Sequence, residues 1–212
     1  MSPEEKKKTE EKIINAAEEI FVNEGFSGTR MQTIADKAGI NKALLHYYYR
    51  SKQKLFYAVF NRLAPRIFSS ILIVLKQDLP LLEKIRKFVY AYIDEISSKN
   101  KHIPLFIISE LERNPDMIAE VMNNTFKSME FNPVRHFEKE VNEEIAAGNI
   151  HPINHKHLFV NIISLSVFPF IGRPIIMKVG EFDNDEYDKF LQDRKKHVAD
   201  FIINSIKSEK QV

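Results

Sequence analysis

Apolar residues recur along the chain with the period of an amphipathic α-helix. Near the N-terminus, Ile13, Ala17, Ile20 and Phe21 are spaced i, i+4, i+7 and i+8, as on one helical face. Similar stripes return throughout the 212 residues, and no stretch alternates with period two for long enough to predict a strand. We therefore expect an all-α protein with about nine helices.

Start and stop signals place these helices. Ser2-Pro3-Glu4-Glu5 and Thr29-Arg-Met-Gln32 each have the pattern of a capping box, and glycine or proline follows several of the stripes. The predicted helices run from Ser2 to Gly25, Thr29 to Gly39, Asn41 to Tyr48, Ser51 to Leu75, Asp78 past Ile93, Pro104 to Leu111, Asp116 to Ala147 with an interruption at Asn132-Pro133, Asn154 to Phe168, and Asn184 to Lys207.

Glycine marks the segment with the strongest signal. Three of the six glycines lie between residues 25 and 39, and Gly39-Ile40-Asn41 joins two short predicted helices. Two short helices joined by a glycine-containing turn form a helix-turn-helix. In the DNA-binding versions of this motif, the second helix enters the major groove.

The charge distribution supports a nucleic-acid partner. The whole chain carries 31 basic and 29 acidic residues, so its net charge is 31 − 29 = +2. Residues 25–54 contain six basic residues and one acidic residue, 6 − 1 = +5, which leaves 25 − 28 = −3 for the remainder. A local basic surface is what phosphate binding requires.

Other classes of function lack support in the sequence. There is no cysteine, and no nucleophile–base motif, phosphate loop or dinucleotide fingerprint, so we expect neither an enzyme nor a cofactor. His151, His155 and His157 lack further nearby ligands, so we expect no metal site. The longest uncharged run, Leu158 to Gly172, has 15 residues, short of the roughly 20 that a membrane span needs. We expect a buried helix there, no membrane contact, and a cytoplasmic protein.

Residues 10–56 contain a set of spaced positions, namely Ile14, Ala17, Phe21-x-x-x-Gly25-Phe-x-Gly-Thr29, Ile34-Ala-x-x-Ala-Gly39-Ile and Lys42-x-x-Leu45-x-x-Tyr48-Tyr-x-Ser51-Lys-x-x-Leu55. With these positions, the segment resembles the DNA-binding domain of TetR-type transcriptional regulators. It implies a helix-turn-helix DNA-binding domain over residues 1–50 and a larger helical effector-binding and dimerisation domain over 51–212. The implied protein is a homodimeric repressor of a semi-palindromic double-stranded DNA operator, released by a small, largely hydrophobic effector.

The resemblance also assigns DNA-binding roles to individual positions. Base edges and phosphates would be met by Thr29, Arg30, Asn41, Lys42, Ala43, Leu44, His46, Tyr47, Tyr48 and Lys52. Ala43 and Leu44 are apolar and suit contact with thymine methyl groups. From periodicity alone, Tyr47 and Tyr48 could be core residues. The run Lys6-Lys7-Lys8 is either a solvated helix face or an electrostatic arm that adds DNA affinity.

For the remainder of the chain, the resemblance implies an effector pocket and a dimer interface. The pocket candidates are Phe60, Phe88, Tyr92, Phe106, Met122, Phe126, Phe137 and Phe168. The interface candidates are Leu158, Ile162, Leu165, Tyr187, Leu191, Val198, Phe201 and Ile202. A packed core explains the first set as well, and packing within one chain explains the second. An all-helical adaptor that senses no effector is the alternative function.

Overall fold

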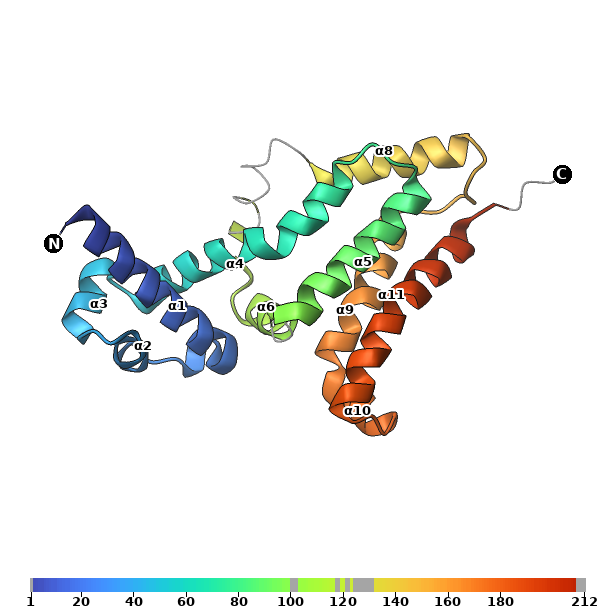
Figure 1. The fold of residues 1–212 in the computed structure, drawn as a ribbon. Helices are drawn as coiled ribbons and strands as arrows, with labels where there is room; N and C mark the ends of the chain where they lie inside the picture. The colour runs from blue at the N-terminus through green and yellow to red at the C-terminus, as the bar shows by residue number, and fades with distance from the viewer. Residues whose placement is uncertain (1, 100–102, 117–118, 121–122, 124–131, 209–212) are drawn as a thin grey trace. The chain divides into compact units, whose positions relative to one another are not determined.

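The computed structural model describes residues 2–99, 103–116, 119–120, 123 and 132–208, which include ten helices and no strand. An isolated antiparallel bridge joins Ile150 and Lys207. The all-α prediction is confirmed over these ranges. In chain order (Figure 1), the helices are α1 Pro3–Gly28, α2 Met31–Ala38, α3 Lys42–Tyr48, α4 Lys52–Leu75, α5 Leu81–Lys99, α6 Ile103–Arg113, α8 Pro133–Ala146, α9 His155–Ile171, α10 Arg173–Val179 and α11 Asn184–Ile206.

Local capping chemistry explains where several helices begin. The backbone N–H of Glu5 donates to Ser2 Oγ at 3.2 Å, and the N–H of Ser2 donates to Glu5 Oε2 at 2.7 Å. This reciprocal pair confirms the first predicted capping box. A second one, between Asp183 and Glu186, opens α11.

Helix α10 was not predicted from the sequence. It has seven residues, lacks a side-chain cap, and lies between Gly172 and Gly180. A helix this short has weak local signals, so its packing against α9 must stabilise it.

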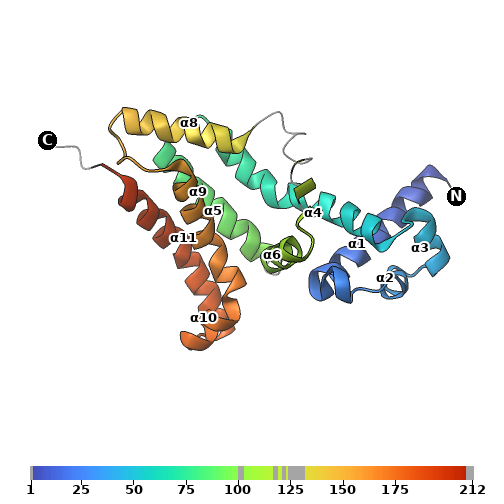
Figure 2. The same cartoon turned by 180° about the vertical axis from the view of Figure 1, so that it is seen from behind.

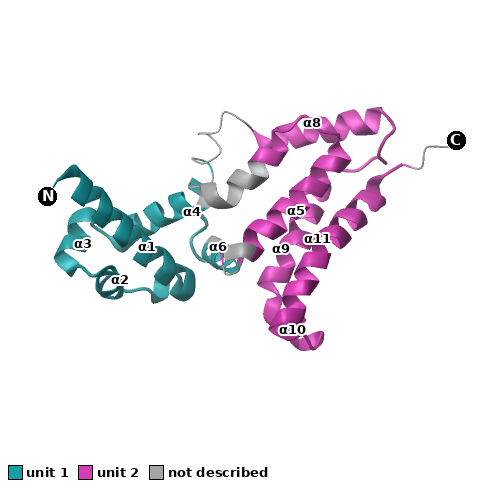
Figure 3. Ribbon diagram, viewed as in Figure 1, with its two compact units in different colours: residues 1–66, 105–128 teal, residues 67–104, 129–212 magenta. Residues whose placement is uncertain are grey.

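The chain divides into two compact units, each with its own core (Figure 3). Unit 1 consists of residues 1–66 and 105–128, and unit 2 of residues 67–104 and 129–212. In the core of unit 1, the ring of Phe56 meets Phe21 edge-on at 5.0 Å and Phe106 at 5.8 Å between centroids. The first segment of unit 1 thus packs against a segment that is far away in the sequence.

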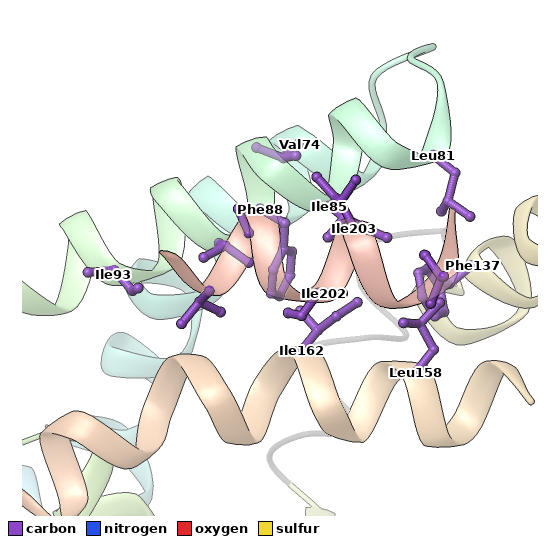
Figure 4. Close-up of a cluster of buried hydrophobic side chains, with 14 of the residues drawn as sticks. Val74, Leu81, Ile85, Phe88, Ile93, Phe137, Leu158, Ile162, Ile202 and Ile203 are labelled. Atoms are coloured by element: carbon purple, nitrogen blue, oxygen red, sulfur yellow. The ribbon is translucent and has the colours of Figure 1, made fainter. Parts of the chain in front are cut away.

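Unit 2 is built around α5, which packs against α8, α9 and α11. Figures 1 and 2 show α5, α9 and α11 side by side in this unit. The close-up in Figure 4 shows the apolar side chains between them. The labelled members of this core are Val74, Leu81, Ile85, Phe88, Ile93, Phe137, Leu158, Ile162, Ile202 and Ile203.

Within the described residues, no single helix is both long and apolar enough to cross a membrane. The pair α9 and α10 passes the length and composition test only when taken together, and it is bent by 73°.

Candidate nucleic-acid interface

The end of α1 differs from its predicted form. Helical hydrogen bonding continues to Gly28, but Gly25 interrupts it with φ 70° and ψ 173°. This backbone conformation is essentially restricted to glycine. Thr29 follows, and its hydroxyl donates to the carbonyl of Gly25 at 2.7 Å while its side chain lies buried.

The predicted Thr29–Gln32 capping box is therefore wrong. The Thr29 hydroxyl is engaged at the end of α1, and α2 starts at Met31 with Arg30 as an N-cap that makes no side-chain cap bond. The side chain of Gln32 donates instead to Asp36 Oδ1 at 2.7 Å. The first backbone N–H groups of α2 thus have no side-chain cap, and Arg30 beside them is exposed.

The turn between α2 and α3 is the one that the sequence predicts. Gly39 is left-handed, with φ 67° and ψ 34°, and its N–H donates to the carbonyls of Ala35 and Asp36. Asn41 Oδ1 accepts a hydrogen bond from the N–H of Leu44 at 2.8 Å, so the predicted N-cap is confirmed. Fully buried Leu45 anchors the seven-residue α3 to the unit.

One face of α3 is exposed. Lys42, Ala43, His46 and Tyr47 occupy it, together with the exposed cap Asn41. Tyr47 is 69% exposed and thus not a core residue in this chain. The face offers an ammonium, an imidazole, a phenol and a methyl group, which suit the polar and apolar edges of bases and phosphates.

The opposite side of α3 is tied to the first turns of α1. Leu44 and Tyr48 are partly buried, and the Tyr48 hydroxyl donates to the carbonyl of Lys6 at 3.4 Å. The neighbouring Tyr49 donates to Glu10 Oε1 at 3.1 Å. Burial, and secondarily the Glu10 carboxylate, raise the pKa of Tyr49. The start of α1, with its lysine run, therefore lies beside the end of α3.

Two of the six basic residues between 25 and 54 have protein partners. Lys37 pairs with Glu19, which precedes it by 18 residues. Lys52 Nζ donates to the carbonyls of Phe26 at 2.8 Å and Thr29 at 3.0 Å. The remaining four are exposed: Arg30, Lys42, Arg50 and Lys54.

Sequence reasoning missed Glu110 of α6. This residue is fully buried, and its Oε1 accepts the N–H of Phe26 at 2.9 Å. The two residues are 84 positions apart, and no local pattern marks the contact. Only an unusual combination, an acidic residue within a stripe of apolar helix positions, could have drawn attention to it.

The pocket candidates lie in the two separate units. Phe60 and Phe106 are buried in unit 1 with ring centroids 6.0 Å apart. In unit 2, Phe88 stacks with Tyr92 at 6.0 Å, and burial raises the pKa of Tyr92 to about 12. Phe137 is buried in the core of unit 2.

Of the other three pocket candidates, only Phe168 is among the described residues. Phe168 is 54% exposed and belongs to the surface of α9. Met122 and Phe126 lie outside the described residues.

Most of the dimer-interface candidates are buried within the chain itself. Six of the eight belong to the core of unit 2: Leu158, Ile162, Tyr187, Leu191, Val198 and Ile202. Their stripes face α5 and each other, which is the intramolecular alternative considered above. Leu165 is partly buried, and Phe201 is 60% exposed. The large apolar side chains that α9 and α11 do leave on the surface include Val160, Phe168 and Phe201.

Among the described residues, no group of three or more histidine, aspartate or glutamate side chains is arranged to hold a metal ion. In the histidine cluster, His155 Nε2 lies 3.7 Å from Glu138 Oε1.

The arrangement of α1 to α3 agrees with comparisons to known proteins. Residues 13–59 match the family described as bacterial regulatory proteins, tetR family. The HTH-type transcriptional activator FasR of Mycolicibacterium smegmatis is 28% identical over 109 residues, 51% of this chain and 50% of the relative. The chain thus covers about half the length of that relative. The HTH-type transcriptional repressor NicS of Pseudomonas putida is 40% identical over 52 residues, 24% of each chain.

Solved structures extend the similarity to the whole fold. The crystal structure of AibR in complex with isovaleryl coenzyme A and operator DNA superposes with a TM-score of 0.69 at 15% identity. The superposition covers 91% of this chain and 97% of that one. At this identity the likeness establishes the fold alone. Over residues 13–59, which take in most of α1, all of α2 and α3 and the start of α4, the chain is thus similar to the bacterial regulatory proteins of the tetR family.

Proposed function

We propose that the chain is a sequence-specific DNA-binding transcriptional regulator that reads its operator with the exposed face of α3. The proposal rests on the joint exposure of Lys42, Ala43, His46 and Tyr47, opposite the buried Leu45. A helix held by one buried residue and presenting donors and a methyl group outwards suits the major groove. Because bacterial operators lie in the cytoplasm, the protein acts there.

Contacts with the DNA backbone come from the start of α2 and the ends of α3. Arg30 is exposed beside the uncapped N-terminus of α2, where the free N–H groups favour an anion. Thr29 has a buried side chain, so it contributes through its main chain. Lys52 reaches a phosphate only by leaving the carbonyls that it now contacts. His46 and Tyr48 complete the predicted set.

The regulator acts as a homodimer, because reading a semi-palindrome requires two copies of α3 related by two-fold symmetry. The exposed apolar side chains of α9 and α11 support an interface on the outer side of these helices. Val160 is 59%, Phe168 54% and Phe201 60% exposed. Covering them removes apolar surface from water, which favours association.

A small, largely hydrophobic effector releases the dimer, which makes it a repressor. Two observations support an effector: aromatic side chains gather in both units, as Phe60 with Phe106 and Phe88 with Tyr92, and the AibR structure of the same fold contains isovaleryl coenzyme A. An effector that prefers a conformer with poorly spaced recognition helices weakens DNA binding by the same coupling free energy.

Titration of labelled DNA from the gene's own promoter region, at several salt concentrations, tests DNA reading. We expect specific binding with a negative slope of log affinity against log salt. Lys42→Ala and Tyr47→Ala should each weaken it by about 1–3 kcal/mol per half-site. Lys189→Ala, an exposed lysine on α11, serves as the control. If neither Lys42→Ala nor Tyr47→Ala changes the DNA affinity, α3 does not contact the operator as proposed.

Sedimentation of the Phe201→Arg variant tests the dimer. A buried, unpaired guanidinium opposes association, so we expect a monomer with an unchanged helical spectrum. Val134→Arg is the matched control, because Val134 is a 51% exposed apolar residue on α8. A Phe201→Arg dimer as tight as the unaltered one places the interface elsewhere.

A further inference from the structure

The turn that connects α1 to α2, residues 25–29, is held by a charged side chain from outside the helix-turn-helix. Glu110 of α6 is 0% exposed, and its Oε1 accepts the N–H of Phe26 at 2.9 Å. Its Oε2 accepts the side-chain amide of Asn114 at 2.9 Å. A buried carboxylate is costly unless hydrogen bonds satisfy it, and both oxygens are satisfied here.

A second charged side chain holds the same turn from the carbonyl side. Lys52 Nζ donates to the carbonyls of Phe26 and Thr29 and lies 4.6 Å from the centroid of the Phe26 ring. Phe26 therefore has a carboxylate on its N–H and an ammonium on its carbonyl. Hydrogen bonds with an ionised partner are roughly twice as strong as neutral ones, so this one residue is fixed from two directions.

The backbone of the turn is shaped to accept the carboxylate. A Cβ placed on Gly25 would lie 3.1 Å from Glu110 Oε1, closer than an ordinary contact. The conformation of Gly25, φ 70° and ψ 173°, also excludes other residues. Glycine at this position thus provides the bend and the space that Glu110 occupies.

What the turn fixes is the start of α2. Arg30 and the uncapped N–H groups of α2 follow it directly, and Thr29 is already engaged with Gly25. The direction of these phosphate-facing groups therefore depends on how residues 25–29 are held. Glu110 lies outside the match to the family, which ends at residue 59.

We propose that Glu110 is a positioning residue for the DNA-binding surface, holding the α1–α2 turn so that the N-terminus of α2 meets the phosphate backbone. The proposal rests on the proposed DNA-binding function. It makes α6 a structural part of the DNA-reading unit, as the composition of unit 1 also implies. Residues 1–50 alone would then lack one of the supports of their own turn.

The test compares full-length variants at one temperature at which each is folded. Glu110→Ala removes the acceptor, Glu110→Gln keeps an acceptor of the same size, and Glu112→Ala removes an exposed carboxylate of the same helix as the control. Backbone amide exchange of residues 26–31 reports the turn directly. Anisotropy titrations with promoter DNA over a salt series report affinity and the number of phosphate contacts.

We expect Glu110→Ala to exchange the Phe26 amide at least tenfold faster and to weaken DNA binding about tenfold, the equivalent of one lost hydrogen bond to a charged group. Its salt slope should become shallower by about 1 per half-site, as for one lost phosphate contact. The DNA affinity and the Phe26 exchange rate of Glu110→Gln should stay within about threefold of those of the unaltered protein. Glu112→Ala should have the same affinity and exchange rate as the unaltered protein. Should Glu110→Ala fail to fold, Asn114→Ala loosens the carboxylate without removing it, and smaller changes in the same direction are expected.

A Glu110→Ala protein that melts earlier but keeps its affinity and salt slope overturns the proposal, because the residue then only stabilises the fold. Unchanged exchange at Phe26 overturns it as well. If the unaltered chain binds no promoter DNA specifically, the proposed function fails. The exchange measurement still decides whether Glu110 holds the turn.

Discussion

Helices α3 in unit 1 and α9 in unit 2 use their side chains in opposite ways. Helix α3 has seven residues, buries only Leu45 fully, and exposes a mixed polar face. Helix α9 has 17 residues, buries Leu158 and Ile162 on one side, and still exposes Val160 and Phe168. The polar groups on α3 can each make a directed hydrogen bond with a partner. The exposed apolar residues of α9 can only be buried, so their role depends on the surface that covers them.

The two units also differ in their buried charges. Glu110 in unit 1 is satisfied by a backbone N–H at the edge of the DNA-binding surface. Lys84 in unit 2 is 2% exposed and pairs with Glu140 while reaching the carbonyl of Leu75 at 3.4 Å. We interpret the first as positioning a surface and the second as stabilising a core, and the two can be separated by experiment.

The largest expected effect is on the stability of unit 2. Glu140→Ala leaves the Lys84 ammonium buried without its carboxylate, so we expect the free energy of unfolding to fall by about 3–5 kcal/mol. DNA affinity below the melting range should not change. Denaturant unfolding and promoter titration measure the two. In contrast, the paired change Lys84→Met with Glu140→Leu should restore most of the stability.

The control for this change is Glu83→Ala, which breaks an exposed pair with Lys87 in the same unit and should cost under about 1 kcal/mol. If Glu83→Ala and Glu140→Ala lowered the free energy of unfolding equally, the burial of Lys84 would not explain how much its ion pair contributes to stability.

An intermediate effect is expected at the cap of α3. Asn41→Ala removes the acceptor for the N–H of Leu44, so the unfolding free energy should fall by about 1 kcal/mol and DNA binding should weaken. Asn41→Asp keeps an acceptor and should keep the stability. Its new carboxylate, next to phosphates, should still weaken DNA binding. If Asn41→Asp binds DNA as tightly as the unaltered protein, the start of α3 is not at the DNA.

The smallest effect concerns the first turns of α1. Changing Lys6, Lys7 and Lys8 together to glutamine distinguishes a solvated face from an electrostatic arm. The contact between the Tyr48 hydroxyl and the carbonyl of Lys6 places this run beside α3, so we expect the salt slope to become shallower by about 1 per half-site. Stability should not change. Lys12→Gln, on the same helix, is the control, and an unchanged slope for the triple variant would assign the run to solvent.

The sequence predicted helix ends and caps correctly where the interactions lie within one turn of the chain. Gly39 adopts the left-handed conformation that ends α2, and Asn41 caps α3, both as predicted, because each interaction joins residues at most four apart. The Thr29–Gln32 pattern failed because Thr29 does not stand at the N-cap position of α2. Because α1 bends at Gly25, α2 begins one residue later than predicted, with Arg30 as its N-cap, and the Thr29 hydroxyl donates back to the carbonyl of Gly25.

Periodicity and capping were enough to predict the all-α fold and the helix-turn-helix, because both are properties of neighbouring residues. They left the exposure of Tyr47 open, and the packing of α3 settled it. Packing between distant segments settled which apolar side chains are buried within the chain, as Leu191 and Ile202 are, and which remain exposed, as Phe201 does. The same packing places the Glu110 carboxylate at the N–H of Phe26 and the Lys52 ammonium at its carbonyl. Such contacts depend on how distant segments pack, and the residues next to an apolar or charged side chain in the sequence do not identify its partner.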